Sequence, residues 1–192
     1  MIDVEQVTAG ETAKLDRGAV TGLISLIAAT TMLVAALTSA YIVRRGLGSD
    51  WKPLDLPFVI PGGVPLLLFS SLALEIGRRA HKSRRKPTFV RAWFSGVLSG
   101  TAFILAQVYG WKQISGTGFS IATSPAAAFL FVITGLFIAL VIGALTALVW
   151  SGFRIARASP ETGYTGLSIA ASYWHYLVCL WIYLVILFHV RS

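Results

Sequence analysis

The sequence has few residues that can carry chemistry. Its 192 residues include one cysteine, three histidines and eight acidic residues. A single cysteine excludes a disulfide or a thiolate metal cluster within one chain. We also find no Ser-His-Asp set, no Cys/His spacing typical of zinc or copper, and no glycine loop that cradles phosphate. We therefore expect the chain to bind no metal or cofactor and to have no active site of its own.

Charge is missing from four long runs, which cover residues 18–43, 92–111, 113–153 and 162–190. A helix needs ~20 apolar residues to cross the hydrocarbon core of a membrane. In lipid, only helices and closed barrels satisfy their own backbone groups, and these runs do not alternate as barrel strands do. The sequence therefore predicts an all-α integral membrane bundle.

We predict five transmembrane helices in one domain that covers residues 18–192. The second is the shortest and carries a charge, Glu75. The polar segment 1–17 lacks the pattern of a signal peptide, and we interpret it as a cytoplasmic tail. The predicted helices span about 18–43, 63–79, 92–111, 125–153 and 164–190.

Lysine and arginine give the predicted orientation. Seven of the 16 lie between Arg78 and Arg91, and alternation of five spans puts eleven on one side and five on the other. Cytoplasmic loops carry the excess of positive charge, so we predict a cytoplasmic N-terminus and a C-terminus on the opposite side. The basic residues that give the net charge of +8 lie at helix ends and in short loops rather than along a groove. No nucleic acid partner is therefore expected. The basic segment is also suited to anionic lipid headgroups, as an alternative to a pure topology signal.

Two ionisable residues lie inside predicted spans. Glu75 is the only carboxylate there, and His175 is the only histidine near the middle of a span. Such residues are functional candidates because each is costly to bury. The alternative for Glu75 is pairing with Arg78 and Arg79 on its own helix. The alternative for His175 is a hydrogen bond to a neighbouring helix.

Small and aromatic residues give a second set of candidates, for helix packing or lipid contact. Gly96 and Gly100 form a small-xxx-small pair in the third span, and Gly135 and Gly143 lie on a stripe with the same spacing in the fourth. Such small residues let helix backbones approach closely. Trp174 and Trp181 lie in the last span beside His175.

Several segments, in order and spacing, resemble subunit III of the haem-copper oxidases in its five-helix bacterial form. The resemblance covers nearly the whole chain from Leu23 on. The segments that carry it are 39–41 with Arg44, 51–54, 66–71 with 74–75 and 78–80, 107–109 with 111–113, 134–136 with 141–143, and 173–176 with Trp181.

The chain departs from the family pattern at polar positions. Family members usually have a glutamate where this chain has Thr30, and two histidines where it has Phe137 and Leu140. They also have a glutamate at the place of Gly110 and an aspartate at that of Val178. A role in proton uptake that needs these groups is therefore in doubt, whereas a packing role is less affected.

The resemblance implies a non-redox accessory subunit of a respiratory oxidase that reduces oxygen to water, in a bacterial cytoplasmic membrane. Haem and copper are then expected in partner subunits, and the partners are the catalytic subunit I, subunit II and membrane lipid. One alternative is a subunit-III-like partner of a nitric oxide reductase. Another is a small independent transporter, although that class usually shows internal repeats with broken helices.

Overall fold

The computed structural model describes residues 4–47, 57–116, 124–157 and 164–190, with side chains throughout except at 4–16, 156, 164 and 190. Every regular element in these ranges is a helix, which confirms the all-α class with five helices. The segment 51–54 used in the resemblance lies outside the described residues. The helices are α1 Val4–Leu47, α2 Gly63–Lys82, α3 Lys86–Gly116, α4 Pro125–Arg157 and α5 Tyr164–Val190.

Four of these helices contain a stretch long and apolar enough to cross a membrane: Arg17–Leu47, Lys86–Gly116, Pro125–Ile155 and Thr165–His189. Helix α2 is not among them, since Glu75, Arg78, Arg79 and Lys82 fall in its C-terminal half. Its 20 residues still correspond to ~30 Å of helix, about the thickness of the hydrocarbon core.

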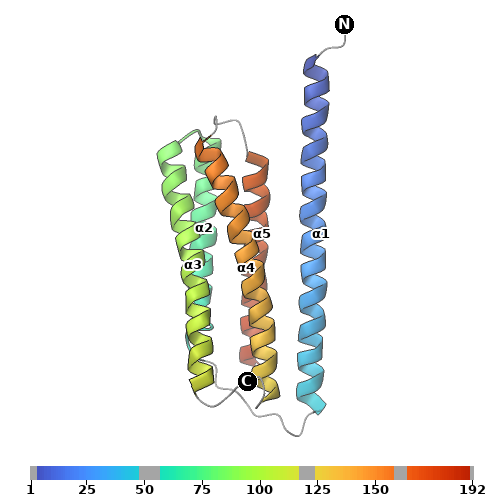
Figure 1. The fold of residues 1–192 in the computed structure, drawn as a ribbon, viewed down its shortest axis with the longest axis vertical. Helices are drawn as coiled ribbons and strands as arrows, with labels where there is room; N and C mark the ends of the chain where they lie inside the picture. The colour runs from blue at the N-terminus through green and yellow to red at the C-terminus, as the bar shows by residue number, and fades with distance from the viewer. Residues whose placement is uncertain (1–3, 48–56, 117–123, 158–163, 191–192) are drawn as a thin grey trace.

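Helices that follow one another in the chain run in alternating directions. Hydrogen bonds between α2 and α3 pair Ser99 with Leu66, and Ser70 with Gly96, in opposite order along the two helices. The same opposite order relates α2 to α5 and α3 to α4. Figure 1 shows the result: the start of α1 and the α2–α3 turn lie at one end, and α5 finishes at the other.

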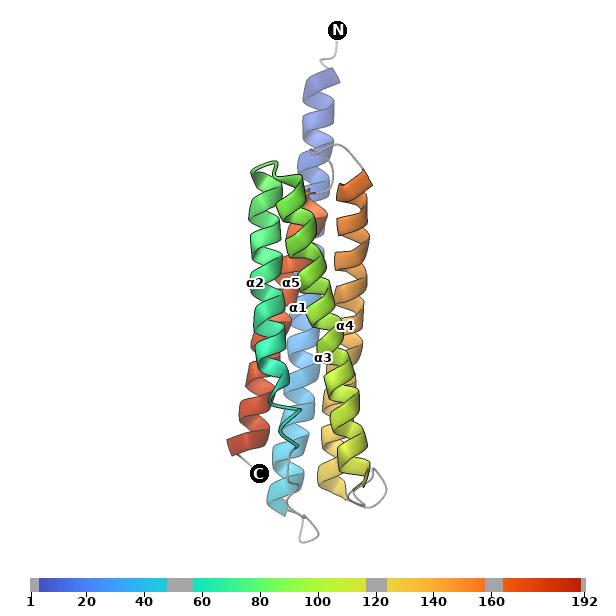
Figure 2. The same ribbon diagram turned by 90° about the vertical axis from the view of Figure 1, so that its left-hand side faces the viewer.

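Helix α1 lies at the edge of the bundle and contacts α4 and α5. Figure 1 shows that its N-terminal part projects beyond the other four helices, and Figure 2 shows α2 and α3 side by side on the opposite face. The segment expected as a polar tail is thus helical from Val4 on. Nucleation is the step of helix formation that costs free energy, and the apolar span has already supplied it. The helix can therefore continue through the preceding residues, which include no proline.

The α2–α3 turn is tight and closes with a Schellman motif. The amide of Arg85 donates to the carbonyl of Ala80, and that of Arg84 donates to His81. Arg84 sits between the two helices with φ of 56°. This left-handed conformation usually favours glycine at the end of a helix.

The core draws on all five helices and has an aromatic cluster that is shared by three of them. Phe103 of α3, Phe137 of α4 and Trp181 of α5 are fully buried, and their rings meet pairwise at centroid distances of 4.7–5.9 Å. Edge-to-face and tilted ring pairs of this kind add to the stability gained by burial. Trp174 lies on the same side of α5 and packs against Gly100 of α3.

Candidate functional site

Glu75 forms a charged cluster on α2. Its carboxylate accepts hydrogen bonds from Arg78 at 2.8 and 3.1 Å and from Arg79 at 2.8 Å. These are the i+3 and i+4 neighbours that the sequence offered as pairing partners. The Glu75 side chain is 21% exposed, Arg78 is 34% exposed and Arg79 is 79% exposed. The cluster therefore neutralises a partly buried carboxylate with two cations of its own helix.

His175 joins this cluster from α5. Its Nδ1 lies 2.6 Å from the hydroxyl of Ser71 on α2, within hydrogen-bond distance. Its Nε2 lies 3.9 Å from the carboxylate of Glu75. About two helical turns from the Ser71–His175 contact, Arg78 donates to Ser168 of α5 at 3.4 Å. The structure thus brings the two ionisable candidates together, and the polar contacts connect α2 to α5.

A second set of polar contacts connects α1 to α5. Three threonines of α1 bond three tyrosines of α5, in the same order along both helices, which therefore run parallel. The pairs are Thr30–Tyr173 at 3.2 Å, Thr31–Tyr176 at 2.8 Å and Thr38–Tyr183 at 3.4 Å. Thr31 already donates to the carbonyl of Ile27 at 2.7 Å, so the Tyr176 hydroxyl is the donor in its pair. Such bonds matter in lipid because lipid supplies no alternative partner.

The two tryptophan candidates are core residues. Trp174 is 1% exposed and Trp181 is fully buried. A methyl group added at Gly100 would come within 2.7 Å of the Trp174 ring, so this glycine is what allows α3 and α5 to meet there. Within this chain neither tryptophan reaches the surface, where lipid would lie.

The two glycine candidates differ from each other. A Cβ built at Gly135 would lie 3.6 Å from the ring of Trp111, an ordinary packing distance. At Gly143 nothing lies within 4 Å of that position, and the residue is exposed. The closest contacts occur at other glycines. Gly96 packs against Leu74 and belongs to the α3 pair that the sequence indicates as a packing face, whereas Gly152, which packs against Trp93, was not singled out.

The positions that depart from the family pattern are used for packing. Phe137 is part of the aromatic core, and Val178 is buried. Gly110 packs against Ile60, whose side chain would be 3.0 Å from an added Cβ. Thr30 is buried and bonded to Tyr173. These sites therefore hold residues that fill space rather than ionisable groups.

Sequence reasoning identified Arg78 and Arg79 as partners of Glu75. It missed Ser71, the partner of His175, and the threonine–tyrosine contacts. Ser71 was visible only as part of a motif, and the tyrosines were visible only as flanks of His175. The signal that could have found them is the repeated spacing of Thr30, Thr31 and Thr38 against the α5 tyrosines, which places hydroxyls at matching heights on two helices. In the part of the chain that the structure describes, no three His, Cys, Asp or Glu side chains gather as a metal site would require.

The fold and the site together define a multi-pass helical membrane protein whose helices are connected by hydrogen bonds and close glycine contacts. The sequence matches the family of cytochrome c oxidase subunit III over residues 2–192, so the chain belongs to that family. The resemblance inferred from the sequence is confirmed, and the alternatives of a nitric oxide reductase partner and an independent transporter are not favoured.

Named relatives agree with this assignment at low identity. Cytochrome c oxidase subunit 3 of Thermostichus vulcanus is 24% identical over 181 residues, which cover 90% of this chain and 87% of the relative. Cytochrome c oxidase subunit 3 of Corynebacterium diphtheriae is 28% identical, and the match covers 84% of this chain and 82% of the relative. The probable cytochrome c oxidase subunit 3 of Mycobacterium tuberculosis H37Rv is 27% identical, with the same coverage.

Proposed function

We propose that this chain is the non-redox subunit III of an oxygen-reducing haem-copper oxidase. In this role it stabilises the catalytic subunit I, contacts subunit II within the same complex and holds membrane lipid. The observation that carries the proposal is the family match along residues 2–192. The haems and copper belong to the partner subunits, and this chain contributes helix surfaces.

The proposal includes five spans in a bacterial cytoplasmic membrane, with a cytoplasmic N-terminus. Two features support α2 as the fifth span: it is long enough to cross, and it packs between α3 and α5. Helices α1 and α5 run parallel, which requires an odd number of membrane crossings between them. Crossing by each of α2, α3 and α4 meets this requirement. Reporter fusions at Lys86 and after Ser192 should report opposite compartments, and the same compartment for both would overturn this topology.

Helix α1 is the element best placed to meet a partner subunit. It contacts the bundle along one side, and large apolar side chains are exposed on its other sides. In a membrane, a helix surface of this kind packs against another helix or against lipid. The exposed residues include Ile24, Leu26, Met32, Leu33 and Val43.

Deletion of the gene tests the accessory role. The remaining complex should keep its haem spectrum, because the redox centres lie in other subunits, but it should lose stability or become inactive during turnover. A complex that lacks haem after the deletion, or that is unchanged in stability and turnover, would contradict the proposal.

A further inference from the structure

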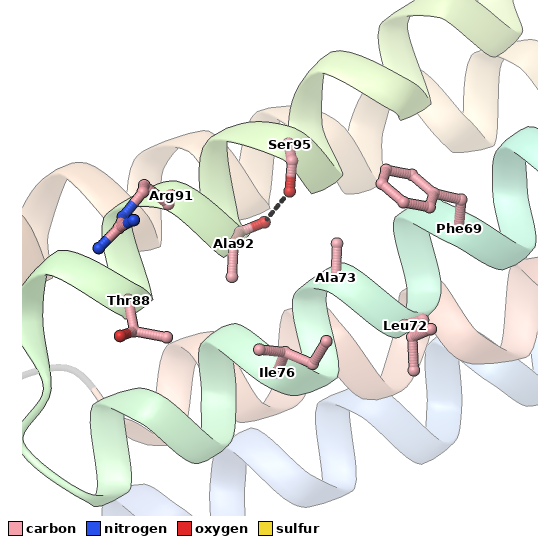
Figure 3. A pocket seen from close by; sticks show the side chains of 8 residues that line it. All are labelled: Phe69, Leu72, Ala73, Ile76, Thr88, Arg91, Ala92 and Ser95. Carbon is pink, nitrogen blue, oxygen red and sulfur yellow. Dashed lines mark hydrogen bonds between the residues drawn. The ribbon is translucent and has the colours of Figure 1, made fainter.

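A groove of about 450 Å³ opens on the outer face of the bundle between α2 and α3. Figure 3 shows its eight lining residues, four from each helix. Phe69, Leu72 and Ile76 project from α2 and are largely exposed, and Ala73 lies buried between them as part of the floor. From Phe69 to Ile76 the groove follows α2 for two turns, or ~10 Å.

The floor of the groove is apolar because its one hydroxyl, that of Ser95, is already hydrogen-bonded to its own helix. Ser95 donates to the carbonyl of Ala92 on its own helix at 2.9 Å, as Figure 3 shows. Ala73 and Ala92 are too small to fill the space between the two helices. The result is a groove with large apolar side chains along its α2 side and small side chains along most of its α3 side, which suits a hydrocarbon chain.

One end of the groove is cationic. Arg91 and Thr88 line this end, and both lie on α3 close to the α2–α3 turn. The Nε of Arg91 donates to the carbonyl of Pro87 at 3.3 Å, which holds the side chain along α3. Both residues are exposed, so the guanidinium and the hydroxyl can be reached from the membrane surface.

Among the described side chains, no nearby carboxylate balances the charge at this end. The segment from Arg78 to Arg91 contains seven lysines and arginines and no acidic residue. Glu75 is the one carboxylate whose side chain the structure describes, and it bonds Arg78 and Arg79. Among the described residues, none supplies an anion to Arg91.

We propose that this groove binds one anionic phospholipid of the leaflet at the α2–α3 turn. The acyl chain lies between α2 and α3, the phosphate accepts from the Arg91 guanidinium, and the Thr88 hydroxyl donates to the same headgroup. The groove is apolar along its length and cationic at the end near the turn. A phospholipid has the same sequence of properties, with an apolar acyl chain followed by a charged headgroup. A partner helix would leave Arg91 unpaired unless it brought a carboxylate to that point. This site lies away from Trp174 and Trp181, and it depends on the proposed function for its place in a membrane.

The experiment uses the full oxidase complex, purified through a tag on this chain and washed extensively in detergent. Phosphatidylglycerol retained per complex is measured by mass spectrometry. Arg91→Gln should lower it about tenfold, the loss expected when one hydrogen bond between charged groups, here guanidinium and phosphate, is removed. Ala73→Leu should lower it as well, because the added side chain fills the floor. Lys86→Gln removes a cation of the same turn that does not line the groove, and it should leave the retained lipid unchanged.

The outcomes separate this proposal from the proposed function. Equal lipid loss in Arg91→Gln and Lys86→Gln would show only general attraction to the basic turn and would overturn the site. Unchanged lipid in both Arg91→Gln and Ala73→Leu, or a crosslink from Ala73→Cys to another subunit, would also overturn it. In each of these cases the complex still assembles, whereas failure of the wild-type chain to co-purify with a haem-bearing subunit would instead contradict the accessory role.

Discussion

The hydroxyl of Ser71 and Nδ1 of His175 lie 2.6 Å apart, and this contact connects α2 to α5 beside the carboxylate of Glu75. His175 thereby has a polar partner inside the bundle, although its side chain is 36% exposed. The same two helices meet again where Arg78 donates to Ser168. Helix α2, the least apolar of the five, is thus fixed to α5 by polar contacts and to α3 by close packing.

Removal of either partner of this hydrogen bond should destabilise the protein modestly. Ser71→Ala and His175→Ala should each lower the free energy of unfolding by ~0.6–1.7 kcal/mol, the range measured for hydrogen bonds between membrane helices. The double variant should lose much less than the sum, since both changes remove the same contact. Thermal unfolding in detergent measures this, and strictly additive losses would show that the contact contributes nothing.

Glu75→Gln should be more costly than either change at the Ser71–His175 contact. It leaves Arg78, which is 34% exposed, without its carboxylate partner. The expected loss is about 1–2 kcal/mol, between the values for surface and for buried ion pairs. Arg79→Ala is the matched control, because Arg79 is 79% exposed and should matter little. Equal losses in the two variants would contradict a special role for the Glu75–Arg78 pair.

The threonine–tyrosine contacts should hold α1 against α5. Replacing Tyr173, Tyr176 and Tyr183 together by Phe removes three hydroxyls while it keeps the rings. We expect α1 to separate more readily, which can be followed by the loss of a disulfide crosslink engineered between α1 and α5.

Thr30→Ala removes one of these bonds but no ionisable group, so it should change proton-coupled turnover little. Val178→Ala, at another position where the family has a carboxylate, should also leave turnover nearly unchanged. A large fall in turnover for either would show that these positions matter in ways that packing does not explain.

Glycine substitutions should separate close contacts from open positions. Gly100→Ala places a methyl group 2.7 Å from the Trp174 ring and should cost ~1–3 kcal/mol, as overpacking usually does. Gly143→Ala meets nothing within 4 Å and should be neutral or stabilising by up to ~1 kcal/mol, because alanine favours helix over glycine. The two variants should differ clearly in thermal midpoint. A destabilised Gly143→Ala in the isolated chain would be inconsistent with the structure.

Much of the fold was predictable because a membrane removes the main ambiguity. A long run without charge can only be a helix in lipid, so α4 and α5 were expected near residues 125 and 164, where they begin. The helical extension of α1 to Val4 was not predicted, since polar residues at a chain end carry no such constraint. The candidate site was predicted only in part. Composition singled out Glu75 and His175, but their contact with Ser71 depends on how two distant helices are turned toward each other.

Packing could be predicted less well than span positions. The small-residue pair Gly96 and Gly100 of α3 does lie at close contacts, but the stripe of α4 is misleading at Gly143, which is open, and the close approach at Gly152 was not singled out. Spacing identifies a face of a helix but does not say which neighbour covers it. The groove of α2 and α3 was missed for the same reason, because its walls come from two helices whose sequences give no joint signal.

The most direct test of the central claim is purification of the chain from its native membrane, followed by reduced-minus-oxidised difference spectroscopy. The account predicts that the chain co-purifies with a large subunit that carries haem, and that the chain separated from that subunit shows no haem or copper absorption. Stoichiometric haem in the isolated chain would contradict the account, as would transport by the chain alone in liposomes or the absence of any haem-bearing partner.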